Sequence, residues 1–187
     1  MEILSTKFDE VVVISPRIFH DPRGYFFETF QAERYKENGI RCNFVQDNIS
    51  YSQKDALRGL HFQHPHGQAK LVSVVRGEVL DVVVDVRKGS PTFGQWEGVV
   101  LSVENHRQLF VPQGFAHGFC VLSEDALFTY KCSEYYAPDA EHGIAWDDPD
   151  VGIKWPIEKP LLSEKDARYP RLRDVDEKNL PVFGGLV

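Results

Sequence analysis

Short apolar runs separated by Gly, Pro, Asn and Asp recur along the whole chain, a pattern typical of many short antiparallel strands. The clearest run is EVLDVVVDVR at residues 78–87. Because side chains alternate between the two faces of a strand, one face is wholly apolar and comprises Leu80, Val82, Val84 and Val86. The other face is mixed and comprises Val79, Asp81, Val83 and Asp85. We expect the apolar face to belong to a core and the mixed face to look onto something polar, with an ordinary solvated face as the alternative for Asp81 and Asp85.

Further stretches with strand character are EVVVIS near residue 10, CNFVQDNIS near 45, LVSVVR before Gly77, WEGVVLSV near 100, QLFVP, GFCVL and LFTYKCS. LVSVVR is joined to the clearest run through Gly77, so the two are predicted to form a hairpin. Only two stretches predict helices. QAERYKENG ends in the C-cap signal Asn38-Gly39, and Ser163 begins an N-cap pattern with an acidic residue three positions on.

The strand pattern predicts an all-β fold, a sandwich or jelly-roll barrel with a few short peripheral helices. The length of 187 residues suits one domain over residues 1–187. Pro and charged residues dominate the tail, so we expect residues 155–187 to form an irregular, partly helical wrap.

Charge and cysteine content narrow the range of functions. The net charge of −7 argues against a general nucleic-acid or membrane surface and leaves anion binding to a local pocket. Cys42, Cys120 and Cys132 are widely spaced and form no C-x-x-C pair, so reduced thiols are expected rather than disulfides or a thiolate zinc site. No segment approaches the roughly 18 apolar residues of a membrane span. We therefore expect a cytoplasmic protein without nucleic-acid or membrane partners.

Three histidines in LRGLHFQHPHGQAK, residues 57–70, are the first candidates for chemistry. His61, His64 and His66 lie close enough in sequence to hold a metal, to include a catalytic base, or to belong to a polar loop. His64 and His66 flank Pro65, which favours a loop for both of them.

A metal-binding cupin usually has two histidines one residue apart, a Glu a few residues on, and a later P-x-G-x-x-H turn. The turn is present as Pro112 to His117. If His64 and His66 are the pair, however, Lys70 stands where the Glu is expected, and an ammonium has no lone pair for a cation. The residues therefore favour no metal. A lysine beside a histidine base suits proton removal next to a carbonyl, because it stabilises the oxyanion that develops.

Several runs, in order along the chain, resemble the dTDP-4-dehydrorhamnose 3,5-epimerase family. They are FHDPRGYF at 19–26, QDN at 46–48, LRGLHFQ at 57–63, VPQGFAHGF at 111–119, Tyr130-Lys131, GIAWDDP at 143–149 and SEKD at 163–166. The resemblance implies a cupin-type jelly-roll homodimer without metal or other cofactor. It also implies a sugar-nucleotide substrate, dTDP-4-dehydro-6-deoxy-D-glucose, whose C3 and C5 are inverted in dTDP-L-rhamnose biosynthesis.

The resemblance further implies a role for particular residues. His61 would be the base, Asp166 the carboxylate that orients it, Tyr130 the acid across the sugar ring and Lys70 the group that stabilises the enolate. The implied substrate-binding residues are Phe19, Arg23, Glu28, Gln46, Asp47, Asn48, Arg58, Lys70, His117, Tyr136, Glu141 and Lys165. Among these, Arg23, Arg58 and Lys165 would meet phosphates, His117 would lie beside the sugar, and Tyr136, or its neighbour Tyr135, would stack on thymine.

Three other functions stay open at this point. A related enzyme would epimerise one carbon only or move the ketone along the ring. A metal-dependent cupin and a sugar-binding module without activity are alternatives from other classes.

Overall fold

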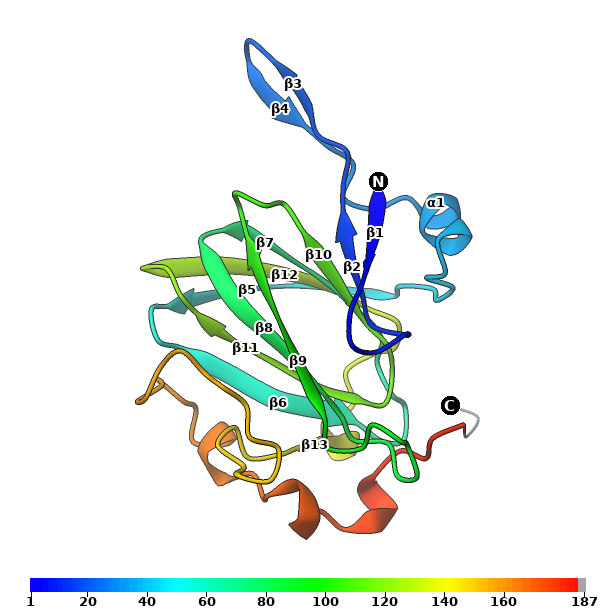
Figure 1. The fold of residues 1–187 in the computed structure, drawn as a ribbon, viewed down its shortest axis with the longest axis vertical. Coiled ribbons are helices and arrows are strands. Elements are labelled where there is room, and N and C mark those ends of the chain that lie inside the picture. The colour runs from blue at the N-terminus through cyan, green and yellow to red at the C-terminus, as the bar shows by residue number, and fades with distance from the viewer. Residues whose placement is uncertain (185–187) are drawn as a thin grey trace.

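Two antiparallel sheets packed face to face form most of the molecule (Figure 1). The computed structural model describes residues 1–184. The first sheet has the strand order β1 (Glu2–Ser5), β2 (Val12–Ser15), β10 (Gln108–Val111), β7 (Lys70–Arg76), β12 (Asp125–Cys132) and β5 (Gln46–Gln53). The second has the order β13 (Glu141–Gly143), β6 (Leu57–Gln63), β11 (Phe115–Val121), β8 (Glu78–Asp85) and β9 (Trp96–Ser102). The predicted all-β jelly-roll sandwich is confirmed.

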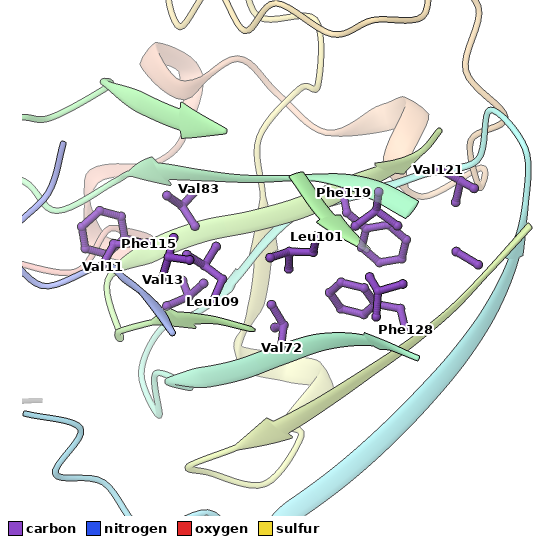
Figure 2. Close-up of a cluster of buried hydrophobic side chains, with 14 of the residues drawn as sticks. Val11, Val13, Val72, Val83, Leu101, Leu109, Phe115, Phe119, Val121 and Phe128 are labelled. Atoms are coloured by element: carbon purple, nitrogen blue, oxygen red, sulfur yellow. The ribbon is translucent and has the colours of Figure 1, made fainter. Parts of the chain in front are cut away.

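The apolar strand faces meet between the sheets and form the main core (Figure 2). Val72 and Leu109 of the first sheet pack there with Val83 and Phe119 of the second. Phe119 also stacks on Phe128 of β12, with ring centroids 4.2 Å apart. Burying such side chains is the main favourable term in folding, so this cluster holds the two sheets together.

The predicted hairpin of residues 71–87 is wrong, because β7 and β8 belong to different sheets. β7 pairs with β10 and β12, whereas β8 pairs with β11 and β9. The chain crosses between sheets at Gly77, whose φ of +79° favours glycine. A Cβ there would lie 2.0 Å from the carbonyl oxygen of Asp125, so a side chain would not fit.

Both faces of β8 are buried, so Asp81 and Asp85 do not form a solvated face, although both meet polar partners, His117 and Arg87. Val79 and Val83 on the mixed face join the core between the sheets. Asp81 and Asp85 on that face are fully buried as well. The apolar face packs outward, against the C-terminal segment, in a second cluster that includes Val82, Val84 and Val86.

The predicted helix near residue 35 is confirmed as α1 (Ala32–Glu37), which Gln31 caps by accepting a hydrogen bond from the Arg34 N–H. The other helices are three-residue 3-10 turns: η1 (Pro138–Ala140), η2 (Asp166–Arg168), η3 (Leu172–Asp174) and η4 (Glu177–Asn179). The N-cap at Ser163 forms as expected, since its hydroxyl accepts a hydrogen bond from the Asp166 N–H, but the turn that follows is η2 rather than an α-helix.

Two peripheral segments frame the sandwich (Figure 1). The segment from η2 to η4, orange to red, runs along the outer face of the second sheet, where Leu172 and Leu180 are buried. The hairpin of β3 (Phe19–Asp21) and β4 (Gly24–Phe26), in blue, projects away from both sheets. None of the helices in the described part of the chain is long and apolar enough to cross a membrane.

Candidate active site

A cavity of about 440 Å³ opens between the two sheets at the polar end of the main core. The stacked Phe119 and Phe128 line it, so the cavity begins where the apolar core ends. Its other lining residues are Gln46, Asn48, Ser50, Arg58, His61, Phe62, Gln63, Gln68, Lys70, His117, Tyr130, Cys132, Tyr136, Glu141, Ser163, Lys165 and Asp166. All four predicted catalytic residues therefore line one cavity.

His61 and Asp166 form a hydrogen-bonded pair in the cavity wall. His61 comes from β6 and Asp166 from η2, 105 residues later, with 2.6 Å between Nε2 and Oδ1. Burial opposes ionisation of Asp166, but hydrogen bonds from His61, Ser163 and the Gly59 backbone hold its pKa below the usual range. An ionised Asp166 accepts the proton on Nε2, so the lone pair of the imidazole is on Nδ1. This is the arrangement of a histidine base oriented by a carboxylate.

Lys70 and Tyr130 lie on the opposite wall, because β7 and β12 belong to the first sheet and β6 to the second. Their strands pair directly, with Tyr130 opposite Val72. Burial raises the pKa of the Tyr130 hydroxyl, which therefore keeps its proton near neutral pH and can donate it. Burial lowers the pKa of the Lys70 ammonium, and the nearby Asp81 carboxylate counteracts this in part.

His117 is the neighbour of His61 across the β11–β6 pairing. Its Nε2 contacts both carboxylate oxygens of Asp81, at 2.8 and 3.0 Å. Burial raises the pKa of Asp81, against the opposing effects of His117 and Lys70. Both histidines of the cavity wall therefore have an aspartate partner: His61 pairs with Asp166 of the C-terminal segment, and His117 pairs with Asp81, which lies behind the wall within the second sheet.

A cationic and hydrogen-bonding rim surrounds the cavity. The Arg58 guanidinium donates from Nε to the Ser52 hydroxyl at 2.8 Å, which fixes its direction. Glu141 accepts hydrogen bonds from Lys165 and, at 2.6 Å, from the Tyr136 hydroxyl. Burial disfavours the Glu141 carboxylate, yet these two donors hold its pKa below the usual range. Arg58 and Lys165 together suit an anionic group such as a phosphate.

Eight of the twelve predicted substrate-binding residues line the cavity, and four do not. Phe19 and Arg23 lie on the projecting β3–β4 hairpin, and Glu28 follows it and pairs with Arg34. Asp47 points to the other face of β5, where it accepts from Lys131 at 2.9 Å and lines a second cavity. The alternation along β5 explains this, since Gln46 and Asn48 face the first cavity.

His64 and His66 do not line the cavity and belong to the loop after β6, as predicted. His66 has a positive φ of 64°, and its carbonyl oxygen accepts a hydrogen bond from the Gln63 side chain at 2.7 Å. Within residues 1–184, no group of three or more His, Cys, Asp or Glu side chains is placed to hold a metal ion.

The sequence did not indicate Ser50, which lines the cavity, or the role of Asp81, which bonds to the cavity residue His117. Asp81 was interpreted as a solvated position, although it is buried and bonded to His117. A carboxylate in an otherwise apolar strand was the available signal, but its partner depends on the β8–β11 register. Ser50 lines the cavity, and its hydroxyl has no hydrogen-bond partner within residues 1–184. Its inward position follows from the strand period, because Ser50 lies two residues after Asn48 and so on the same face of β5.

A histidine–carboxylate pair that faces a lysine and a protonated tyrosine across a jelly-roll cavity suits proton removal beside a carbonyl. Fold and site together define the chain as a cupin-type isomerase. The model of the dTDP-4-dehydrorhamnose 3,5-epimerase family matches residues 5–174. The chain belongs to this family.

Known relatives agree with this assignment. The dTDP-4-dehydrorhamnose 3,5-epimerase of Methanothermobacter thermautotrophicus is 51% identical over 91% of this chain and 94% of its own length. The dTDP-6-deoxy-D-glucose-3,5-epimerase structure from Legionella pneumophila, in complex with dTDP-4-keto-L-rhamnose, is 54% identical with a TM-score of 0.95, covering 97% of this chain and 98% of that one. The 3'-monoepimerase ChmJ from Streptomyces bikiniensis, in complex with dTDP-quinovose, is 39% identical with a TM-score of 0.89, covering 95% and 91%.

Proposed function

We propose that this chain inverts C3 and C5 of dTDP-4-dehydro-6-deoxy-D-glucose, giving dTDP-4-dehydro-L-rhamnose for dTDP-L-rhamnose biosynthesis in the cytoplasm. The observation that carries the proposal is the His61–Asp166 pair on one wall of a cavity whose other wall holds Lys70 and Tyr130. The Legionella pneumophila relative, in complex with dTDP-4-keto-L-rhamnose, supports the same substrate class.

The reaction needs only proton transfers. Nδ1 of His61 takes the proton from the carbon beside the C4 ketone, the C–H electron pair forms a C=C bond, and the carbonyl electrons move to oxygen. The Lys70 ammonium stabilises this enolate oxygen. Tyr130 then returns a proton to C5 from the opposite face, and the ketone re-forms. At C3, His61 removes the proton in the same way and a water molecule returns one from the opposite face. Exchange with solvent removes the proton from His61 and restores the one on Tyr130, so both groups are ready for the next proton transfer. Placement of base and acid on opposite sheets supports inversion rather than return of the proton to the same face.

The cavity rim would hold the nucleotide. Arg58 and Lys165 bind the phosphates, since a guanidinium and an ammonium both favour such anions. Tyr136, whose hydroxyl donates to Glu141, stacks its ring on thymine. Gln46, Asn48 and Glu141 supply the remaining polar contacts, and His117 lies beside the sugar.

The chain acts as a homodimer in which each β3–β4 hairpin carries Phe19, Arg23 and Glu28 to the other subunit's cavity. Three facts support this arrangement. The hairpin projects from the sandwich (Figure 1), those residues lie outside the cavity of their own chain, and the Phe19 and Phe26 side chains are exposed at 50% and 70%. Mixing inactive His61→Ala with inactive Arg23→Ala should restore part of the activity, because hybrid dimers contain one intact site. No recovery on subunit exchange would contradict the shared site.

The test of the reaction is incubation with dTDP-4-dehydro-6-deoxy-D-glucose in deuterated water, followed by NMR. We expect deuterium at both C3 and C5, and no deuterium at either carbon would sink the proposal. His61→Ala should abolish exchange at both carbons. Tyr130→Phe should retain much of the exchange but lose inversion at C5, and full inversion in that variant would remove its assigned role.

A second candidate is epimerisation of one carbon only, because the 3'-monoepimerase ChmJ has the same fold and is 39% identical to this chain. The same NMR experiment separates the two, because a monoepimerase inverts C3 and leaves the configuration of C5 unchanged. Stoichiometric metal by elemental analysis would instead favour a metal-dependent cupin. Tight nucleotide binding without any proton exchange would favour a binding module.

A further inference from the structure

Tyr169 contacts the base His61 and has no role in the reaction proposed above. It follows η2 directly, at the C-cap position, where the backbone is extended with φ −63° and ψ 142°. Its ring packs against the His61 imidazole in a T-shaped arrangement, with centroids 5.6 Å apart and planes at 64°. Because Asp166 begins the same turn, one short segment brings both a carboxylate and an aromatic ring to His61.

A glycine in the neighbouring strand makes room for this ring. Gly143 of β13 pairs directly with His61 of β6. A Cβ at Gly143 would lie 2.6 Å from both Cε2 and Cζ of Tyr169, closer than real atoms approach. The slot beside His61 therefore exists because position 143 has no side chain, and the tyrosine ring fills it.

The hydroxyl of Tyr169 does not explain why the ring is there. It is buried and makes no well-formed hydrogen bond within residues 1–184, although the Lys165 ammonium lies near it. Burial, with the nearby Glu141 carboxylate, raises the pKa of Tyr169 to about 12, and Lys165 opposes this shift. Because no well-formed hydrogen bond of the hydroxyl holds the ring in place, a phenyl ring would fill the slot in the same position. The contact with His61 is thus a property of the ring.

We propose that Tyr169 is a positioning residue for His61, and that its ring holds the imidazole in the orientation in which Nδ1 meets the substrate. The hydrogen bond to Asp166 holds the imidazole at Nε2 alone, so small rotations of the ring are restrained there by one contact. Contact with a second ring restrains these rotations further. The inference rests on the proposed function, in which His61 removes the protons at C3 and C5.

Two variants of the full-length protein test the inference. Tyr169→Phe keeps the ring and should retain kcat within about twofold. Tyr169→Leu removes it and should lower kcat roughly 10- to 100-fold, with KM changed less than about threefold, since misplacing a catalytic group by about 1 Å costs up to about 100-fold. Deuterium incorporation at C3 and C5 should fall by the same factor, because one base serves both carbons. Phe93→Leu is the matched control, because Phe93 is 40% exposed and does not line the cavity.

A spectroscopic measurement makes the result independent of turnover. The ring current of residue 169 shifts the carbon-bound imidazole protons of His61, so these NMR signals should move in Tyr169→Leu and stay near their wild-type positions in Tyr169→Phe. Wild-type kcat in Tyr169→Leu, or an equal loss of kcat in Tyr169→Phe, would overturn the inference. Absence of epimerisation by the wild-type protein would instead overturn the proposed function, while the NMR shifts would still report the contact.

Discussion

Replacing Asp166 by Asn removes a charge and keeps the shape of the side chain, so it isolates what the carboxylate does for His61. The amide oxygen can still accept the Nε2–H hydrogen bond that measures 2.6 Å to Oδ1 in the native protein. What disappears is the negative charge that stabilises His61 once it has taken a proton. Asp166 is 5% exposed, so solvent screens this interaction weakly.

The size of the effect follows from the type of hydrogen bond. Hydrogen bonds to charged groups contribute about 1.5–3 kcal/mol, and neutral ones about 0.5–1.5 kcal/mol. A loss of about 1–2 kcal/mol in the transition state corresponds to roughly a 5- to 30-fold lower kcat, at 1.36 kcal/mol for each factor of ten. If the amide turns its NH₂ group toward Nε2, the wrong imidazole tautomer is favoured and the loss is larger.

The assay is the initial rate of deuterium incorporation at C3 and C5, measured at saturating substrate. Both rates should fall together, and KM should change little because the lost charge acts on His61. Glu164→Gln is a matched control, since the Glu164 side chain is 88% exposed and pairs with Arg168. A kcat for Asp166→Asn within twofold of wild type would refute the assignment of Asp166 as the partner of the base.

Three further predictions concern the pKa of Lys70, the packing at Gly118 and the effect of Asp166 on stability. Asp81→Asn removes the charge that raises the pKa of Lys70 against the effect of burial, so Lys70 should lose its proton at lower pH and the alkaline limb of kcat should move to lower pH. Gly118→Ala should destabilise the fold by about 1–3 kcal/mol in urea unfolding, because its Cβ would lie 2.5 Å from the Arg58 carbonyl oxygen. The pKa of Asp166 lies below its ordinary 3.8 when folded, so this group stabilises the protein above that pH. The stability advantage of wild type over Asp166→Asn, measured by urea unfolding, should therefore shrink as pH falls below 3.8.

Strand positions could be predicted because the signal is local. The alternation of apolar and polar side chains that predicts a strand needs only a few consecutive residues. The strands predicted from it at β5, β8 and β12 are present in the structure. Which strand pairs with which depends on residues far apart in the sequence, so it could not be predicted from a local pattern. The hairpin predicted around Gly77 failed because the chain changes sheets there, and what fixes that crossing is contact with Ser123 and Asp125, far along the sequence.

Some residues of the candidate site could likewise be predicted from the sequence, and others could not. Resemblance to a known family indicated His61, Lys70, Tyr130 and Asp166, and the structure brings all four to one cavity. Asp81 could not be assigned from its strand, because only the β8–β11 register brings it to His117. The sequence also could not predict that Phe19, Arg23 and Glu28 lie outside the cavity, because a local pattern does not show the direction in which a hairpin projects.

The two walls of the cavity and its C-terminal side depend on different parts of the fold. The sheets and the core between them bring His61, Lys70 and Tyr130 together without help from the C-terminal segment. Asp166 and Tyr169, which act on His61, arrive with a segment held by a separate cluster around Leu172 and Leu180 on the outer face of the second sheet. If His61 is the base, as proposed, packing of that segment supplies both of the side chains that hold it, whereas the main core holds the two sheets together. Because Leu172 and Leu180 lie in a cluster separate from the core between the sheets, we expect Leu180→Ala to lower the rate of deuterium incorporation more than it lowers the urea midpoint of the sandwich.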